Sequence, residues 1–215
     1  MNIKDDLLRE KLIVIVRGVQ SDKLIPLAQA VYDGGIRFLE ITYSADGKVS
    51  DSETASNIKS LVEHFGDKMH IGAGTVLTEE QVLLTKAAGG KFIISPDADI
   101  DIIKKTKEMD LISIPGAFTA SEIKQAYKAG ADFVKLFPIT QMGPDYVKAI
   151  KAPLSHIPLL AVGGVDISNM NEFLEAGVCG FGIGTNITNK KMIEENDFEG
   201  ITALAKEYVA VIKDE

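Results

Sequence analysis

LIVIVRGVQSDKLIPLAQAVYDGGIRFLEIT, residues 12–42, contains the unit from which the whole chain is built. It begins with the apolar run Leu12–Arg17, which lacks polar alternation, as a strand buried on both faces does. A helical pattern follows, with an expected cap at Ser21-Asp22 and an expected end at Gly34-Gly35. A second apolar run, Phe38–Thr42, then begins. This order predicts a strand, a helix and a second, parallel strand.

The same unit recurs along the chain at a spacing of roughly 20–30 residues. We therefore predict an α/β fold in which residues 1–215 form a single-domain (β/α)8 TIM barrel. The first segment, Ile3–Glu10, is expected to be an extra N-terminal helix that closes the bottom of the barrel. An open doubly wound sheet is the alternative, less favoured because no Gly-x-Gly-x-x-Gly turn follows the first run. The apolar runs are Leu12–Arg17, Phe38–Thr42, His70–Val76, Phe92–Pro96, Leu111–Pro115, Phe133–Phe137, Leu159–Gly163 and Gly180–Thr185.

Composition narrows the class of protein. The 215 residues have a formal net charge of −8, and 46% of them are hydrophobic, which fits one globular domain. The acidic balance argues against binding to nucleic acid or to an anionic membrane, and no apolar run reaches the ~18 residues of a membrane span. The lone Cys179 and the three His lack metal-ligand spacing, so we expect neither a metal nor a cofactor. The charged N-terminus lacks the apolar stretch of a secretory signal, so we expect a cytoplasmic protein.

Two ionisable residues lie inside predicted strands. Lys135 lies in Phe133–Pro138 and Glu40 lies in Phe38–Thr42, each among apolar residues. Burial lowers the pKa of a lysine and raises that of a carboxyl, which suits an amine nucleophile and an acid/base group. A snorkelling lysine, or a structural ion pair of Glu40 with Lys135 or Arg17, explains the same pattern without catalysis.

Glycine-rich turns follow the last two predicted strands. Gly163-Gly164 comes after the seventh apolar run, and Gly184-Thr185 ends the eighth. The loops after strands seven and eight of such barrels commonly hold a phosphate on backbone N–H groups and a helix N-terminus. An acidic protein can therefore bind an anion without a basic patch. The alternative is that these glycines only permit tight turns.

With these residues in place, the sequence resembles the aldolases that cleave 2-keto-3-deoxy-6-phosphogluconate (KDPG) and 4-hydroxy-2-oxoglutarate (KHG), including the 6-phospho-2-dehydro-3-deoxygalactonate aldolases. The resemblance covers nearly the whole chain. The matching stretches are residues 13–18, Leu39-Glu40-Ile41-Thr42, residues 71–76, Ile94-Ser95-Pro96, Pro115-Gly116, residues 134–138, Gly143-Pro144, residues 162–165 and Gly184-Thr185.

The resemblance implies a class I aldolase, a carbon–carbon lyase on a (β/α)8 barrel that is usually a homotrimer and needs no metal. It implies Lys135 as the Schiff-base lysine and Glu40 as the acid/base. The expected ligands are a phosphorylated 2-keto acid, pyruvate and glyceraldehyde 3-phosphate. Arg17, at the end of the first predicted strand, is our candidate for the substrate carboxylate. The remaining expected substrate-binding residues are Thr75, Pro96, Phe137, Val162, Gly163, Gly164, Gly184 and Thr185.

Two departures from the gluconate-type pattern leave the substrate open. Ser44 stands where many such members carry an Arg, and Val162 stands where they carry a Thr. The expected substrate is KDPG, with its C4 epimer 6-phospho-2-dehydro-3-deoxygalactonate, or KHG, as alternatives. A phosphosugar isomerase barrel is disfavoured because metal-binding His and Asp are missing from the strand ends. The alternative from a different functional class is a barrel that binds a phosphosugar without catalysing a reaction.

Overall fold

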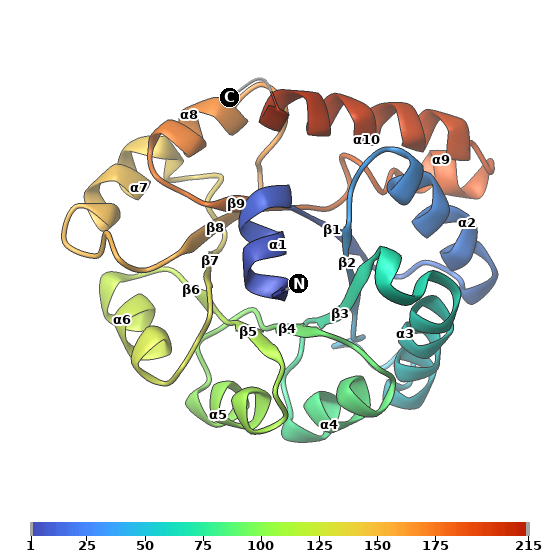
Figure 1. Ribbon diagram of the computed structural model, residues 1–215, viewed down its shortest axis with the longest axis horizontal. Coiled ribbons are helices and arrows are strands. Elements are labelled where there is room, and N and C mark those ends of the chain that lie inside the picture. The colour runs from blue at the N-terminus through green and yellow to red at the C-terminus, as the bar shows by residue number, and fades with distance from the viewer. Residues whose placement is uncertain (1, 214–215) are drawn as a thin grey trace.

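The computed structural model describes residues 2–213, and its strands form one ring with the helices outside (Figure 1). Every strand pair is parallel, and the order around the sheet is β5-β4-β3-β2-β1-β9-β8-β7-β6. The predicted barrel with its alternating helices is confirmed. The strands are β1 (Leu12–Val16), β2 (Phe38–Thr42), β3 (His70–Gly74), β4 (Phe92–Ile94), β5 (Ile112–Ile114), β6 (Gly116–Ala117), β7 (Val134–Leu136), β8 (Leu159–Val162) and β9 (Gly180–Ile183).

The helices also follow the predicted alternation, although one detail at a helix end differs. The cap of the second helix is Gln20, so Ser21 and Asp22 are the first helical residues and neither is the cap. The helices are α1 (Ile3–Glu10), α2 (Ser21–Asp33), α3 (Asp51–Phe65), α4 (Glu79–Ala87), α5 (Ile100–Glu108), α6 (Ala120–Lys128), α7 (Gly143–Lys151), α8 (Met170–Glu175), α9 (Lys190–Glu194) and α10 (Phe198–Lys213), with a 3₁₀ turn at Gly66–Lys68. Among residues 2–213, no helix has the length and apolar content that crossing a bilayer requires.

The fifth barrel strand is divided into two segments, β5 and β6. The described residues therefore form nine strands, where the sequence predicts eight. β5 pairs with β4, β6 pairs with β7, and only Pro115 separates the two segments. Proline has no N–H to donate to a ladder, so it interrupts the strand. Its carbonyl still accepts a hydrogen bond from the Lys135 N–H at 2.9 Å, and the ring of strands closes through this residue.

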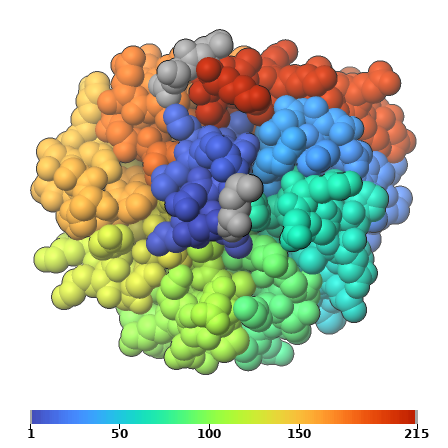
Figure 2. Space-filling view, in the orientation of Figure 1, coloured from blue at the N-terminus to red at the C-terminus, as the bar shows by residue number. Residues whose placement is uncertain are grey.

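The helix α1 covers the bottom of the barrel, as predicted. It lies across the centre of the ring in Figure 1, and its surface fills that centre in Figure 2. Leu7 is 1% exposed and joins the apolar cluster inside the barrel, which includes Ile13, Phe38 and Phe92. A second, larger cluster lies between the strands and the surrounding helices. The barrel interior below the mouth is therefore filled by side chains.

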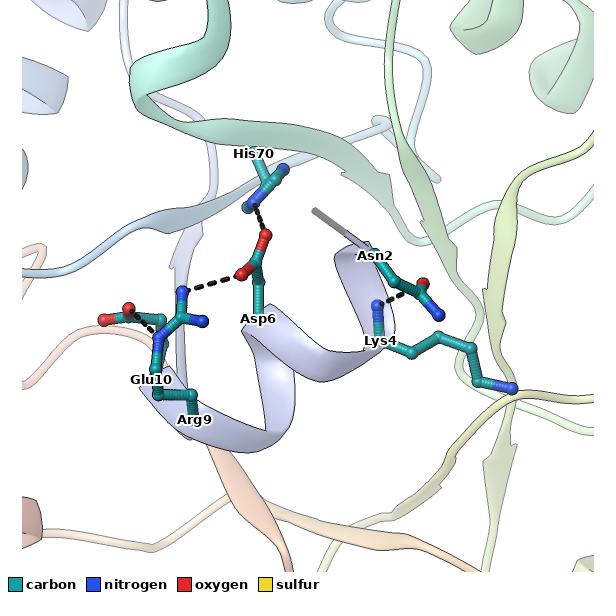
Figure 3. Close-up of polar contacts among 6 residues, drawn as sticks. All are labelled: Asn2, Lys4, Asp6, Arg9, Glu10 and His70. Atoms are coloured by element: carbon teal, nitrogen blue, oxygen red, sulfur yellow. Dashed lines mark hydrogen bonds and ion pairs between the residues drawn. The ribbon is translucent and has the colours of Figure 1, made fainter.

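Polar contacts fix α1 to the barrel. The buried Asp6 accepts hydrogen bonds from Arg9 Nη2 at 2.7 Å and pairs with His70 Nε2 at 3.1 Å, as Figure 3 shows. Burial acts to raise the pKa of Asp6, but the hydrogen bonds from Arg9 and His70 outweigh it and hold that pKa below its ordinary value. Lys4 forms a second link, an ion pair of 2.9 Å with the buried Asp132. These contacts orient the apolar face of α1 toward the barrel interior.

The packing of α1 yields a matched pair of mutations. Leu7→Ala removes a fully buried side chain and should lower the free energy of unfolding by about 2–5 kcal/mol, because the barrel interior cannot close around the lost volume. Leu8→Ala removes a neighbouring side chain that is 43% exposed and should change it by less than about 0.5 kcal/mol. Urea denaturation measures both. Equal effects of the two substitutions would show that Leu7 of α1 does not pack inside the bottom of the barrel.

Candidate active site

A cavity of about 570 Å³ opens at the carboxyl ends of the strands, on the opposite side of the barrel from α1. All residues that the sequence analysis assigned to catalysis or substrate binding line this one cavity. The strand ends are where barrels of this kind carry their chemistry. The assigned residues are Arg17, Glu40, Thr75, Pro96, Lys135, Phe137, Val162, Gly163, Gly164, Gly184 and Thr185.

Glu40 enters the cavity from the middle of β2. Its side chain is 2% exposed, and none of residues 2–213 forms a hydrogen bond with its Oε2 atom. Burial raises the pKa of the Glu40 carboxyl, while the positive charges of Lys135 and Arg17 oppose that rise. A carboxyl that is buried without hydrogen-bond donors is stabilised in its protonated form, which suits exchange of a proton with a ligand.

Lys135 enters the same cavity from β7, across the barrel from β2. Its side chain is 8% exposed, and its Nζ atom lies 4.5 Å from the centre of the Phe137 ring. Burial lowers the pKa of Lys135; Glu40 opposes this shift and Arg17 adds to it. The lowered pKa favours the neutral amine, the form that attacks a carbonyl, and Lys135 lines the cavity in which a ligand would meet it.

Arg17 and Thr75 form the polar pair at one side of the mouth. Arg17 Nη2 donates a hydrogen bond of 2.9 Å to Thr75 Oγ1. Thr75 has a φ of 55°, in the left-handed region that β-branched residues rarely adopt. Such strain is found most often at functional sites, where neighbouring structure maintains it. Here the strained residue directs its hydroxyl to the guanidinium that faces the cavity.

Glycine turns border the other side of the mouth. Gly163 and Gly164 have φ values of 88° and 81°, and a Cβ atom at Gly164 would lie 2.2 Å from Thr140 Oγ1. That hydroxyl donates a hydrogen bond of 2.7 Å to the Gly163 carbonyl. The tight turn therefore needs glycine at position 164 for its backbone shape and for space. Thr185, two residues after the end of β9, is exposed and lines the same cavity as this turn.

The cavity also contains residues that the sequence analysis missed. Asn186 is the polar one among them; its Nδ2 atom donates a hydrogen bond of 3.2 Å to the Val165 carbonyl. It directly follows Thr185, so extending the last strand end by one residue would have found it. Ser44, the first departure from the gluconate-type pattern, lies outside this cavity. It lines an adjoining hollow of about 410 Å³ that shares Arg17, and its hydroxyl donates to Asp46 at 2.6 Å.

A buried amine and a buried carboxyl in one barrel mouth are the arrangement of an enzyme that forms an imine and moves protons. A model of the KDPG and KHG aldolase family matches residues 3–204. The chain belongs to this family. The protein is accordingly an aldolase, a carbon–carbon lyase. In residues 2–213, no three His, Cys, Asp or Glu side chains converge as a metal site would require.

Individual relatives of this aldolase cover nearly its whole length. The 2-dehydro-3-deoxy-6-phosphogalactonate aldolase of Escherichia coli is 34% identical over 92% of this chain and 94% of its own. The 2-dehydro-3-deoxy-phosphogluconate aldolase of Haemophilus influenzae is 29% identical over 96% and 95% of the two chains. A crystal structure of the Legionella pneumophila KDPG aldolase, with pyruvate captured as a covalent carbinolamine, has a TM-score of 0.85 and 26% identity. It covers 96% of this chain and 97% of that one.

The burial of Glu40 predicts a pH-dependent difference in stability. Because the pKa of Glu40 is raised above 4.5, the wild-type protein loses stability as the pH rises from the pKa of the unfolded chain through that of the folded state. Gln has no such proton to lose. Glu40→Gln should therefore raise the unfolding temperature at about pH 8, and the gain should shrink toward about pH 4. Differential scanning calorimetry measures this difference. The exposed Glu207→Gln is the control, and a gain independent of pH would contradict the prediction.

The strain at Thr75 predicts a second effect on stability. Thr75→Gly removes about 1–3 kcal/mol of backbone strain, and it loses about 0.5–1 kcal/mol to the flexibility of glycine and a similar amount with the Arg17 hydrogen bond. Its free energy of unfolding should therefore stay level or rise by about 1 kcal/mol. The same change at Thr42, in β2, removes a buried side chain without relieving strain and should destabilise the protein. Equal losses in urea denaturation would show that Thr75 is unstrained.

Proposed function

We propose that this aldolase cleaves KDPG to pyruvate and glyceraldehyde 3-phosphate by a Schiff-base mechanism, with Lys135 and Glu40 as its catalytic residues. The observation that carries the proposal is the pair itself. An amine with a lowered pKa and a carboxyl with a raised pKa are buried in one cavity, from opposite sides of the barrel. Two titratable groups whose environments shift their pKa values in opposite ways suit nucleophilic and acid/base roles.

The reaction begins at the keto group of the substrate. The neutral Lys135 amine attacks C2, and the C2 oxygen takes up a proton from solvent and leaves as water. The protonated imine that remains can accept the electron pair of the C3–C4 bond. Glu40, directly or through water, takes the proton from the C4 hydroxyl. The C3–C4 bond then breaks: its electrons form an enamine on C3, and C4 leaves as the aldehyde of glyceraldehyde 3-phosphate. Protonation of C3 and hydrolysis of the imine release pyruvate and restore the lysine.

The anionic groups of the substrate fit opposite sides of the mouth. Arg17 can form a charge-assisted hydrogen bond with the carboxylate, and the Thr75 hydroxyl orients its guanidinium. The phosphate fits the glycine turns at Gly163-Gly164 and Gly184-Thr185, whose backbone can approach an anion closely. Pro96 and the Phe137 ring complete the walls around the keto acid. Local groups thus hold a doubly acidic substrate in a protein with a net charge of −8.

The configuration at C4 decides between two substrates of this site. Val162 is 6% exposed and presents an apolar side chain to the cavity, where a hydroxyl would select one epimer by hydrogen bonding. The Escherichia coli relative carries the galactonate epimer in its name, and the Haemophilus influenzae relative carries the gluconate one. We propose KDPG as the main substrate, with 6-phospho-2-dehydro-3-deoxygalactonate and then KHG as the competing ones.

We further propose that residues 1–215 form one domain, that the chain assembles as a homotrimer and that it works in the cytoplasm. One continuous sheet supports the single domain. Burial raises the pKa of the lone Cys179 thiol to about 11, which fits a cysteine with no redox role.

Exposed apolar side chains such as Ile167 and Leu83 are candidates for subunit contacts in the proposed trimer. Light scattering should give three times the 23.2 kDa chain mass, and the mass of one chain would contradict the trimer.

The synthetic direction of the reaction tests the function most sharply. Incubation with pyruvate and glyceraldehyde 3-phosphate should yield a product whose C4 configuration, assigned by NMR, is mainly that of KDPG. Lys135→Met should abolish the product, whereas Lys148→Met, an exposed lysine on α7, should leave it unchanged. A product with the opposite configuration at C4 would make 6-phospho-2-dehydro-3-deoxygalactonate the main substrate. Absence of any product, and of a borohydride-reduced pyruvate adduct on Lys135, would favour a non-catalytic binding barrel.

A further inference from the structure

Gly74, the last residue of β3, lies directly against the carboxyl of Glu40. A Cβ atom built on Gly74 would be 1.5 Å from Glu40 Oε1, 2.2 Å from Cδ and 2.6 Å from Cγ. No other glycine among residues 2–213 has so close an approach. The Glu40 side chain thus occupies the volume that any side chain at position 74 would fill.

The need for glycine here is steric, not conformational. Gly74 is not among the glycines with positive φ, so its backbone is open to any L-residue. The same face of β3 repeats the pattern two residues earlier, where a Cβ atom on Gly72 would lie 2.4 Å from the Phe92 ring. Alternate residues of a strand share a face, so Gly72 and Gly74 both line the barrel interior. This bare face of β3 accepts the Phe92 ring below and the Glu40 carboxyl above.

Packing, and not hydrogen bonding, sets the position of this carboxyl. Within residues 2–213, no hydrogen bond is formed with Oε2 of Glu40, and its side chain is 2% exposed. Long-range attraction to Lys135 and Arg17 is the polar influence on it. No hydrogen bond to Oε2 would therefore hold the carboxyl in place if a neighbouring atom displaced it.

We infer that Gly74 is a positioning residue: its missing side chain provides the space in which Glu40 holds the acid/base carboxyl opposite Lys135. The inference rests on the proposed function, because it assigns Gly74 to the same proton-transfer step. To bring a methyl group at position 74 into ordinary contact, Oε1 must move by about 2 Å. Displacement of a reacting group by about 1 Å can cost about 10²-fold in rate. Lys135 belongs to β7, across the barrel, and keeps its place.

Gly74→Ala separates the two chemical steps. Its kcat for cleavage should fall about 10²-fold, while the maximal yield of borohydride-reduced pyruvate adduct on Lys135, read by mass spectrometry, should stay within about 2-fold of wild type. Glu40→Gln, which removes the acid/base group, should give the same pattern. Adding Gly74→Ala to Glu40→Gln should then lower kcat no further, since the group that it displaces is already inactive.

A truncated side chain provides the rescue. Glu40→Ala removes Cγ, Cδ and Oε1, the three atoms that the methyl group would meet, so adding Gly74→Ala to this variant should change its residual kcat by less than about 3-fold. This comparison also stands if Gly74→Ala alone does not fold, because the space is then already free. Thermal unfolding confirms that each protein is folded.

Three results would overturn the inference. They are a folded Gly74→Ala enzyme with wild-type kcat, a parallel loss of adduct and cleavage, and a further large drop when Gly74→Ala is added to Glu40→Ala. Failure of the proposed function gives a different result, because the wild-type protein would then form no adduct on Lys135 at all.

Discussion

The burial of two ionisable groups, the Glu40 carboxyl and the Lys135 amine, is the constraint on which the rest of this structure depends. Glu40 and Lys135 are 2% and 8% exposed, and burial disfavours the charged form of each. Their mutual attraction offsets only part of this cost, because burial outweighs it in the pKa shift of each group. The free energy of folding must therefore come from elsewhere in the barrel, and the two groups are left able to exchange protons with a ligand.

The barrel supplies that free energy in layers below the mouth. The interior under the cavity is filled by Phe38, Phe92 and their neighbours, and α1 closes it from beneath through Leu7. The strand ends above are built differently, from glycine turns, an exposed guanidinium and the strained Thr75. One end of the fold thus favours stability and the other favours chemistry, which is the usual division in parallel barrels.

Apolar runs and glycine stops were sufficient to predict the barrel, the N-terminal helix and the polar strand-end residues Lys135, Glu40 and Arg17. Pro96 and Phe137 were expected from the family resemblance. What periodicity could not show are effects of geometry. The division of the fifth strand at Pro115 depends on which ladder each segment joins, and the strain of Thr75 depends on its φ angle. Gly74 was overlooked as a site residue because its contribution is an absent side chain, visible only once Glu40 is placed beside it. The chemical roles of the cavity residues stay predictions.

The protonation state of Lys135 tests the central claim most directly. NMR titration of its side chain, assigned by comparison with Lys135→Met, follows the carbon next to the amine as the pH rises. The account predicts a midpoint below 10.5, the ordinary value of a lysine, and a further decrease in Glu40→Gln, where the opposing carboxylate is lost. A midpoint at or above 10.5 would show that Lys135 is solvated or ion-paired, and it would contradict the account.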